Sequence, residues 1–92
     1  MLIALDFDGT YTADPDLWQA FIRQAQARGH QVFVVTMRHE HENLDVERQL
    51  LGVADRIIYT CRRAKRPHVE FLGHRVQIWI DDQPHWVNQD SL

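Results

Sequence analysis

Cysteine is nearly absent from this sequence, since Cys61 is its only example. An intramolecular disulfide is therefore excluded, and the composition is typical of a protein from a reducing compartment. The sequence also lacks a long apolar run and a basic N-terminal stretch leading into one. We therefore expect neither a membrane span nor a signal peptide, and we predict a cytoplasmic protein.

Positive charge is not in excess either. Ten Lys and Arg residues stand against thirteen Asp and Glu residues, so the net charge is −3. A field over the whole molecule that would attract nucleic acid is not expected. Repeats and low-complexity tracts are missing as well, and 92 residues suffice for one small domain. We predict a single domain over residues 1–92.

The first apolar run leads directly into two carboxylates. Residues 2–5 are all apolar, Asp6 and Asp8 follow, and Gly9 favours a turn. An apolar run without polar alternation predicts a strand buried on both faces, and ligands of α/β proteins bind at the carboxyl ends of such strands. Two acids this close favour a bound cation, and oxygen ligands favour Mg²⁺. The alternative is that both acids are turn caps or solvated loop residues.

Strand patterns alternate with helix patterns along the rest of the chain. Helices are expected at about residues 15–28, 43–51, 67–72 and 84–87, and strands at residues 31–36, 56–60 and 76–80. This alternation predicts an α/β fold, namely a small Rossmann-like three-layer sandwich with a mostly parallel four-stranded sheet. Residues 89–92 are expected to be loose.

Polar residues follow the other predicted strands too. Thr36 ends the second strand, Lys65 lies just before the predicted helix at residues 67–72, and Asp81 and Asp82 follow the fourth strand. Parallel strands bring their carboxyl ends to one edge of the sheet, so these side chains should meet. Phosphoryl transfer needs such a set, because it requires a nucleophile, a cation and donors for the phosphoryl oxygens.

These segments resemble the motifs of the haloacid dehalogenase (HAD) superfamily of phosphotransferases. The first motif is similar to residues 6–10, the second to Thr36, the third to Lys65 and the fourth to residues 79–82, in the order of the family. The resemblance covers most of the chain and implies a HAD-like core. Few residues separate the motifs where relatives insert a cap domain, so a capless version is expected.

The resemblance also implies roles in catalysis. Asp6 would be the nucleophile that forms an aspartyl-phosphate, and Asp8 would be the general acid and base. Thr36 and Lys65 would bind the phosphoryl oxygens. The expected activity is that of a Mg²⁺-dependent phosphomonoester hydrolase, with the substrate left open.

The metal ligands implied by the resemblance come from both acidic motifs. Mg²⁺ would be bound by the Asp6 carboxylate and the Asp8 backbone carbonyl. Of the last acidic pair, Asp82 is the expected direct ligand and Asp81 the ligand that acts through a water molecule.

Other interpretations stay open. The chain could be a non-catalytic binding or regulatory module that keeps the pocket. It could also be a phosphatase for nucleotides or nucleic-acid ends, because Arg62, Arg63 and Arg66 surround Lys65, although such a run is also typical of a solvated loop. His39 and His41 alone are weak grounds for a zinc site.

The fourth strand is expected at an edge of the sheet. Relatives continue after the fourth motif with a helix and another strand, and without these the strand that carries Trp79 would be open to pairing. We therefore hypothesise a homodimer or a partner at that edge.

Overall fold

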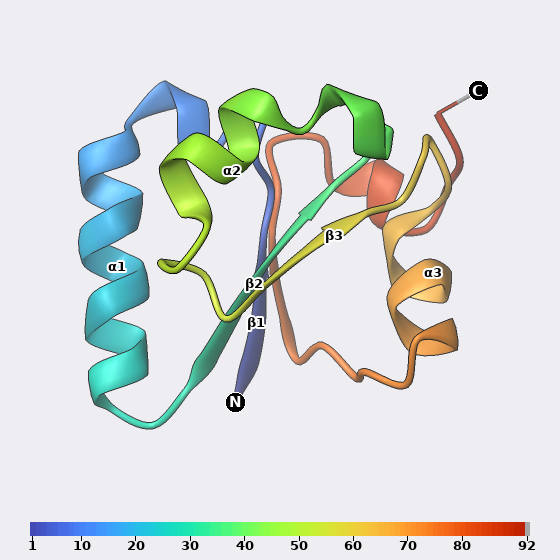
Figure 1. The fold of residues 1–92 in the computed structure, drawn as a ribbon. Helices are drawn as coiled ribbons and strands as arrows, with labels where there is room; N and C mark the ends of the chain where they lie inside the picture. Colours follow the sequence, from blue (N-terminus) through green and yellow to red (C-terminus); the bar gives the residue numbers. More distant parts are fainter. Residues whose placement is uncertain (92) are drawn as a thin grey trace.

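The computed structural model describes residues 1–91 of the chain, and Leu92 lies outside them. Four strands and three α-helices alternate along the chain (Figure 1). The strands are β1 (Leu2–Leu5), β2 (Gln31–Thr36), β3 (Arg56–Tyr59) and β4 (Ile78–Ile80). The helices are α1 (Pro15–Ala27), α2 (Leu44–Leu50) and α3 (Lys65–Phe71), and short 3₁₀ helices cover Tyr11–Ala13, Glu40–Glu42 and Pro84–Val87.

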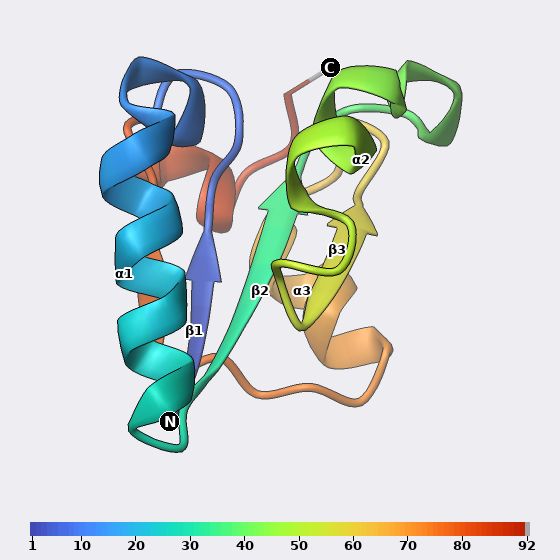
Figure 2. The same cartoon turned by 60° about the vertical axis from the view of Figure 1, so that its left-hand side comes forward.

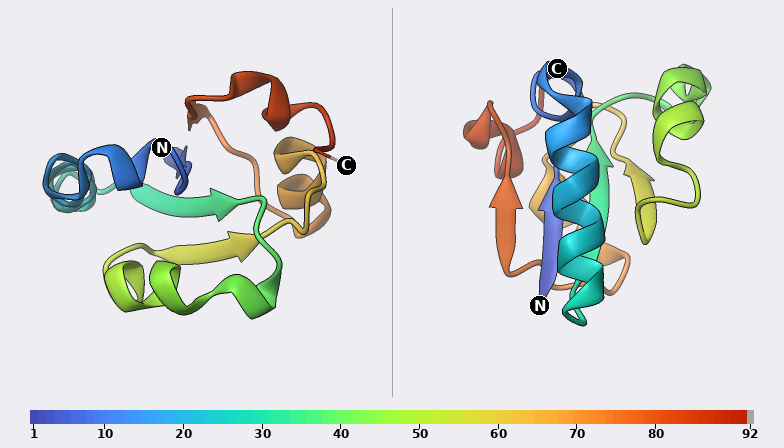
Figure 3. Two further views of the ribbon diagram at one scale, coloured as in Figure 1. Left: turned by 90° about the horizontal axis from the view of Figure 1, so that it is seen from above. Right: turned by 90° about the vertical axis from the view of Figure 1, so that its left-hand side faces the viewer.

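The strands form one sheet in the order β3-β2-β1-β4, and every neighbouring pair is parallel. Helices α1 and α2 cover one face of the sheet and α3 covers the other (Figures 2 and 3). This is the predicted Rossmann-like three-layer arrangement, and the sheet is parallel throughout. None of the helices within residues 1–91 has the length and apolarity that a membrane span needs.

The two central strands, β1 and β2, are buried on both faces, as their unbroken apolar runs predict. Ile3 and Leu5 point toward α1 and join the cluster that contains Ile22 of that helix. Ala4, between them, points to the opposite face and joins the cluster that contains Val69 of α3. Alternate residues of a strand point to opposite faces, so both sides of β1 must be apolar.

The order of the strands reverses at β1. The chain moves from β1 outward to β2 and β3, and then α3 carries it back across the other face so that β4 pairs with the free side of β1. In open α/β sheets, the carboxyl ends on either side of such a reversal form the usual ligand-binding crevice. Here the residues that follow β1 and β4 flank this point, which lies at the upper end of the sheet in Figure 2.

Two boundaries differ from the prediction by two residues, and the other differences are of one residue. Helix α3 begins at Lys65 and not near Pro67, because a proline is tolerated in the first helical turn, where its missing N–H would have no partner in the helix. Strand β4 begins at Ile78 and not at Val76. The side-chain amide oxygen of Gln77 accepts a hydrogen bond from Leu2 N–H at 2.8 Å, which replaces a main-chain ladder bond.

Candidate active site

Lys65 lies between two carboxylates at the centre of the site. Its ammonium nitrogen Nζ is 2.7 Å from Asp6 Oδ1 and 2.6 Å from Asp81 Oδ2. Only 1% of the Lys65 side chain is exposed. A buried ammonium group needs such partners, because desolvation of an unpaired charge costs several kcal/mol. The structure thus joins the start of α3 to the loops that follow β1 and β4.

The hydroxyl of Thr10 connects Asp6 with the other acid of the fourth motif. Thr10 Oγ1 lies 3.1 Å from Asp6 Oδ2 and 3.2 Å from Asp82 Oδ1, and it accepts a hydrogen bond from Asp82 N–H at 3.1 Å. A hydroxyl has one proton and can donate it to only one of the two carboxylates. The Thr10 hydroxyl therefore leaves one of these two carboxylate oxygens free for another partner.

Three carboxylates meet closely enough to bind a metal ion. One oxygen each from Asp6, Asp81 and Asp82 lies within 4.8 Å of the other two. Three hard oxygen donors suit Mg²⁺, Ca²⁺ or Mn²⁺, and one lysine does not neutralise three acids. The donor set therefore fits a divalent cation, although it does not single out Mg²⁺.

Hydrogen bonds distinguish the two acids that follow β4. Both oxygens of Asp81 accept protein hydrogen bonds, one from Lys65 and one from Gln83 N–H at 2.9 Å. Asp82 Oδ1 lies beside the Thr10 hydroxyl, and Asp82 Oδ2 faces the backbone of Gly9. Asp82 thus has more free ligand capacity, which supports the hypothesis that it is the direct ligand and that Asp81 acts through a water molecule.

Burial changes the acidity of Asp6. Removal of the carboxyl from water raises the pKa of Asp6 to about 7, although the charge of Lys65 and its hydrogen bond oppose the shift. A divalent cation beside Asp6 would favour the ionised form, which is the form that a nucleophilic carboxylate needs.

Asp8 does not join the acidic cluster. It forms a two-pronged ion pair with Arg38, in which Nε donates to Asp8 Oδ2 at 2.9 Å and Nη2 donates to Oδ1 at 2.8 Å. These hydrogen bonds raise the pKa of Arg38 above its ordinary value. The Arg38 guanidinium also lies over the Phe7 ring, 5.0 Å from its centroid, and its Nη1 donates to the Glu42 carbonyl. Arg38 therefore holds the Asp8 carboxylate in a fixed direction.

Thr36 ends β2 beside this ion pair. It is buried, and its hydroxyl accepts a hydrogen bond from Arg38 N–H at 3.3 Å. Among residues 1–91 no acceptor is found for the proton of this hydroxyl, so the proton can point to a ligand.

One pocket of about 270 Å³ brings together four of the six predicted site residues, namely Asp6, Asp8, Thr36 and Lys65. A phosphate group fits within this volume. Asp81 and Asp82 line a neighbouring hollow together with Gly9 and Thr10. The pocket wall is completed by side chains outside the predicted set, namely Met37, Arg38, Arg62, Trp86 and Ser91.

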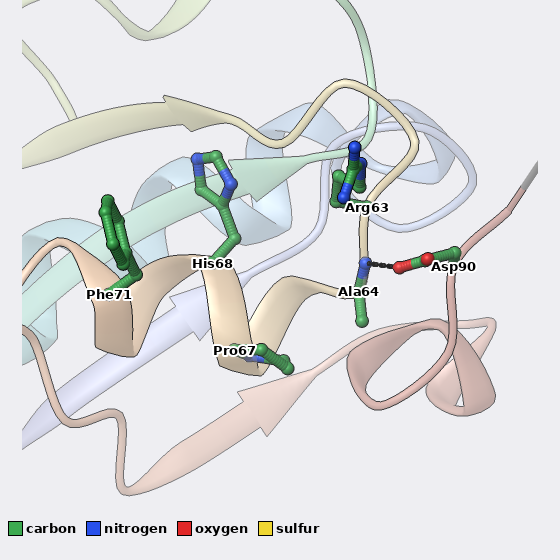
Figure 4. Close-up of a pocket in the computed structure, with 6 residues that line it drawn as sticks. All are labelled: Arg63, Ala64, Pro67, His68, Phe71 and Asp90. Atoms are coloured by element: carbon green, nitrogen blue, oxygen red, sulfur yellow. Dashed lines mark hydrogen bonds between the residues drawn. The ribbon is translucent and has the colours of Figure 1, made fainter.

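Ser91 forms part of this wall and Asp90 is held by a hydrogen bond, so the prediction that residues 89–92 are loose is wrong for these two residues. Asp90 Oδ1 accepts a hydrogen bond from Ala64 N–H at 2.7 Å, at the start of α3 (Figure 4). Ser91 N–H donates to the Arg62 carbonyl at 2.8 Å. These contacts join loops that are far apart in the sequence, so no local sequence pattern could predict them.

The loop between β3 and α3 has an unusual backbone. Cys61 and Arg62 both have positive φ angles, 55° and 68°, although neither is glycine. Their N–H groups bond to the carbonyls of Arg38 and Met37, which holds the loop beside the end of β2. Such conformations cost free energy and are frequent at functional sites. The result is that Arg62 lines the pocket.

Comparison of the chain with protein-family models, with curated proteins and with solved structures gave no match. The resemblance to the HAD superfamily therefore rests on the sequence motifs of this chain alone.

Proposed function

We propose that the protein is a phosphomonoester hydrolase of the HAD type that requires a divalent cation and acts through an aspartyl-phosphate on Asp6. The observation that carries the proposal is the position of the Asp6 carboxylate. It lies at a pocket large enough for a phosphate, with Lys65 on one oxygen and the acidic cluster beside it. A negatively charged nucleophile can approach a phosphate only where positive charge offsets their repulsion.

The first chemical step transfers the phosphoryl group to Asp6. An Asp6 oxygen forms a bond to phosphorus while the bond from phosphorus to the alcohol oxygen breaks. Asp8 enters this step in its protonated form, gives its proton to that oxygen and becomes a carboxylate. Thr36 and Lys65 donate hydrogen bonds to the phosphoryl oxygens. A bound Mg²⁺ would supply charge neutralisation and would fix the orientation of the phosphate.

The second step releases inorganic phosphate. A water molecule attacks the phosphorus and gives its proton to Asp8 while the bond to Asp6 breaks. Both Asp8 oxygens accept from Arg38 in the structure, and release of one of them by Arg38 would open that oxygen fully to proton transfer. A phosphate dianion is a strong competing acceptor for an arginine, which gives a physical reason for that release.

The side chains of the pocket wall favour one class of substrate. Trp86 and Arg62 both line the pocket. The Arg62 guanidinium donates to the Met37 carbonyl and to Glu42 Oε1, so binding of a phosphate there would compete with the contact to Glu42. Aromatic rings stack on nucleobases and arginine binds a second phosphate, so nucleotides and phosphorylated nucleic-acid ends are the first substrates to test.

The experiment is phosphate release from nitrophenyl phosphate, nucleotides, sugar phosphates and end-phosphorylated oligonucleotides. Each substrate is tested with Mg²⁺ and with EDTA, using the wild type, Asp6→Asn and the control variant Asp16→Asn. Asp16 is an exposed acid in the first turn of α1, away from the pocket. We expect release that needs both Mg²⁺ and Asp6 and that Asp16→Asn retains.

The opposite result would favour the non-catalytic alternative. If wild type and Asp6→Asn release equally little phosphate from every substrate while Mg²⁺ still binds, the hydrolase proposal is wrong. The pocket would then belong to a binding or regulatory module.

A further inference from the structure

An apolar surface lies beside β4, on the face of the sheet that α1 covers only in part. A hollow of about 320 Å³ between α1 and β4 is lined by Phe21, Ile78, Ile80 and other mostly apolar side chains. It meets the neighbouring hollow beside Leu17 at Ile80. Exposed fractions of 55% for Leu17 and 39% for Ile78 are large for such residues. Within residues 1–91 no helix lies over β4 on this side (Figure 3).

The outer edge of β4 is also open to main-chain hydrogen bonding. β4 is the last strand of the sheet and pairs only with β1 among the described strands. The Ile80 carbonyl accepts from Asp6 N–H at 2.9 Å and therefore faces β1. Main-chain groups of successive residues point in opposite directions, so Trp79 turns its N–H and C=O outward. An apolar surface beside an open strand edge suits another strand more than it suits a small ligand.

We propose that this surface binds a second copy of the chain, with the two β4 strands antiparallel around a twofold axis at Trp79. In that register the Trp79 N–H and C=O of each copy bond to those of the other, as in a hydrogen-bonded antiparallel pair. Ile78 of one copy then lies opposite Ile80 of the other. Both side chains point to the α1 face, so the apolar hollows of the two copies become one buried core.

Charge favours a second copy over an unrelated partner. Near the carboxyl end of the sheet, this surface is bordered by the acids Asp14 and Asp82. Near the amino end it is bordered by Arg28 and His30, and the chain's amino group lies 2.7 Å from His30 Nδ1. The twofold axis exchanges the two ends, so the acidic end of each copy meets the basic end of the other. The surface is therefore complementary to itself.

The proposed dimer leaves the catalytic pocket accessible. The pocket is lined by Thr36, Arg38 and Arg62, which come from β2 and from the loops after β2 and β3, on the other side of β1 from β4. The hollow that Asp82 lines belongs to the dimer surface, so the second copy would limit the access of water to the cation side of the acidic cluster.

Mass measurement by size-exclusion chromatography with light scattering, over a concentration series, tests the proposal. We expect the wild type to have twice the 10.9 kDa mass of one chain. Ile78→Lys should have the single-chain mass, because it places a charge in the shared core. Phe71→Lys is the matched control, because Phe71 is 89% exposed on α3, away from this surface, and its variant should remain dimeric.

A second variant is needed because Ile78→Lys could lose the dimer simply by failing to fold. Arg28 is exposed at the end of α1, so Arg28→Glu should fold, as circular dichroism can verify, yet it should shift the equilibrium toward the monomer. High salt should weaken the wild-type dimer in the same direction.

Hydrogen exchange locates the interface. The Trp79 amide should be protected in the wild type at high concentration and should exchange fast in Arg28→Glu. A wild type that is monomeric throughout the series would overturn the proposal. A dimer that keeps its mass in both variants, or that leaves the Trp79 amide unprotected, would also overturn it.

Discussion

The backbone of Gly9 lies against the carboxylate of Asp82. A Cβ atom added to Gly9 would clash with Asp82 Oδ2, and the φ angle of Gly9 is +86°. Two separate constraints therefore require glycine at this position, one from the backbone conformation and one from the close approach of a proposed metal ligand.

Gly9→Ala is expected to impair metal binding as well as stability. The strained φ angle should lower the unfolding free energy by about 1–3 kcal/mol, and displacement of Asp82 should weaken Mg²⁺ binding by roughly tenfold or more. Calorimetry and chemical denaturation measure the two effects. Gly73→Ala is the matched control, because Gly73 has a φ angle of +93° but no atom within 4 Å of the added Cβ. Equal metal affinity in the two variants would contradict the assignment of Asp82.

Lys65→Met is expected to destabilise the protein strongly. The substitution leaves the carboxylates of Asp6 and Asp81 buried without their cation, which costs about 3–5 kcal/mol. Chemical denaturation at neutral pH measures the loss, and added Mg²⁺ should restore part of it. Arg63→Met, at an exposed neighbouring position, should have little effect. If Lys65→Met and Arg63→Met were equally stable, the ion pairs of Lys65 would contribute nothing net.

Asp8→Asn should lower the rate of hydrolysis by an amount that depends on the leaving group of the substrate. An alkyl alcohol needs a proton to leave, so kcat for alkyl phosphates should fall by about 100-fold or more. Nitrophenolate leaves easily without a proton, so nitrophenyl phosphate should lose much less. Arg38→Gln should show the same dependence with a smaller loss, because it only releases Asp8 from its fixed direction. Arg48→Gln, at an exposed position of α2, is the control for Arg38. A uniform loss of kcat/KM, which reports the first step, for all substrates would exclude the role of Asp8 as the acid of that step.

Tyr59 should make stability dependent on pH in the alkaline range. Burial, and then the hydrogen bond from its hydroxyl to Glu47 Oε2 at 2.9 Å, raise the pKa of Tyr59 to about 12. The unfolded chain loses this proton near pH 10, so the stabilisation is complete below pH 10 and is lost as the pH rises from about 10 to 12. The difference in unfolding free energy between wild type and Tyr59→Phe should therefore shrink over that range. A constant difference would mean that Tyr59 ionises equally in both states.

The sheet and most of the site could be predicted from the sequence because each depends on a local pattern. The buried strands β1 and β2 are unbroken apolar runs, and a parallel sheet brings the residues that follow such runs to one edge. This argument alone predicts that Asp6, Thr36 and Lys65 lie at the same edge of the sheet. The start of α3 was missed, because Pro67 is a frequent first helical residue and here occupies the third position.

The contacts between loops could not be predicted. Asp8 forms an ion pair with Arg38, and Ser91 N–H donates to the Arg62 carbonyl. These residues lie far apart in the sequence, and no helix or strand periodicity relates their positions. Trp86 is similar, because an aromatic residue in a short helical turn fits a core position as well as a pocket wall. Only the folded arrangement shows which of these residues surround Asp6.

The central position of β1 in the sheet has a consequence for folding. Ile3 pairs with Ile78, so the main-chain hydrogen bonds on one edge of β1 can form only after β4, the last strand of the described chain, has reached the sheet. The acidic cluster needs this long-range pairing, because one of its acids follows β1 and the other two follow β4. A cation at the proposed site would therefore bind only to the completed topology and not to any local segment, and it would stabilise the fully assembled fold as a whole.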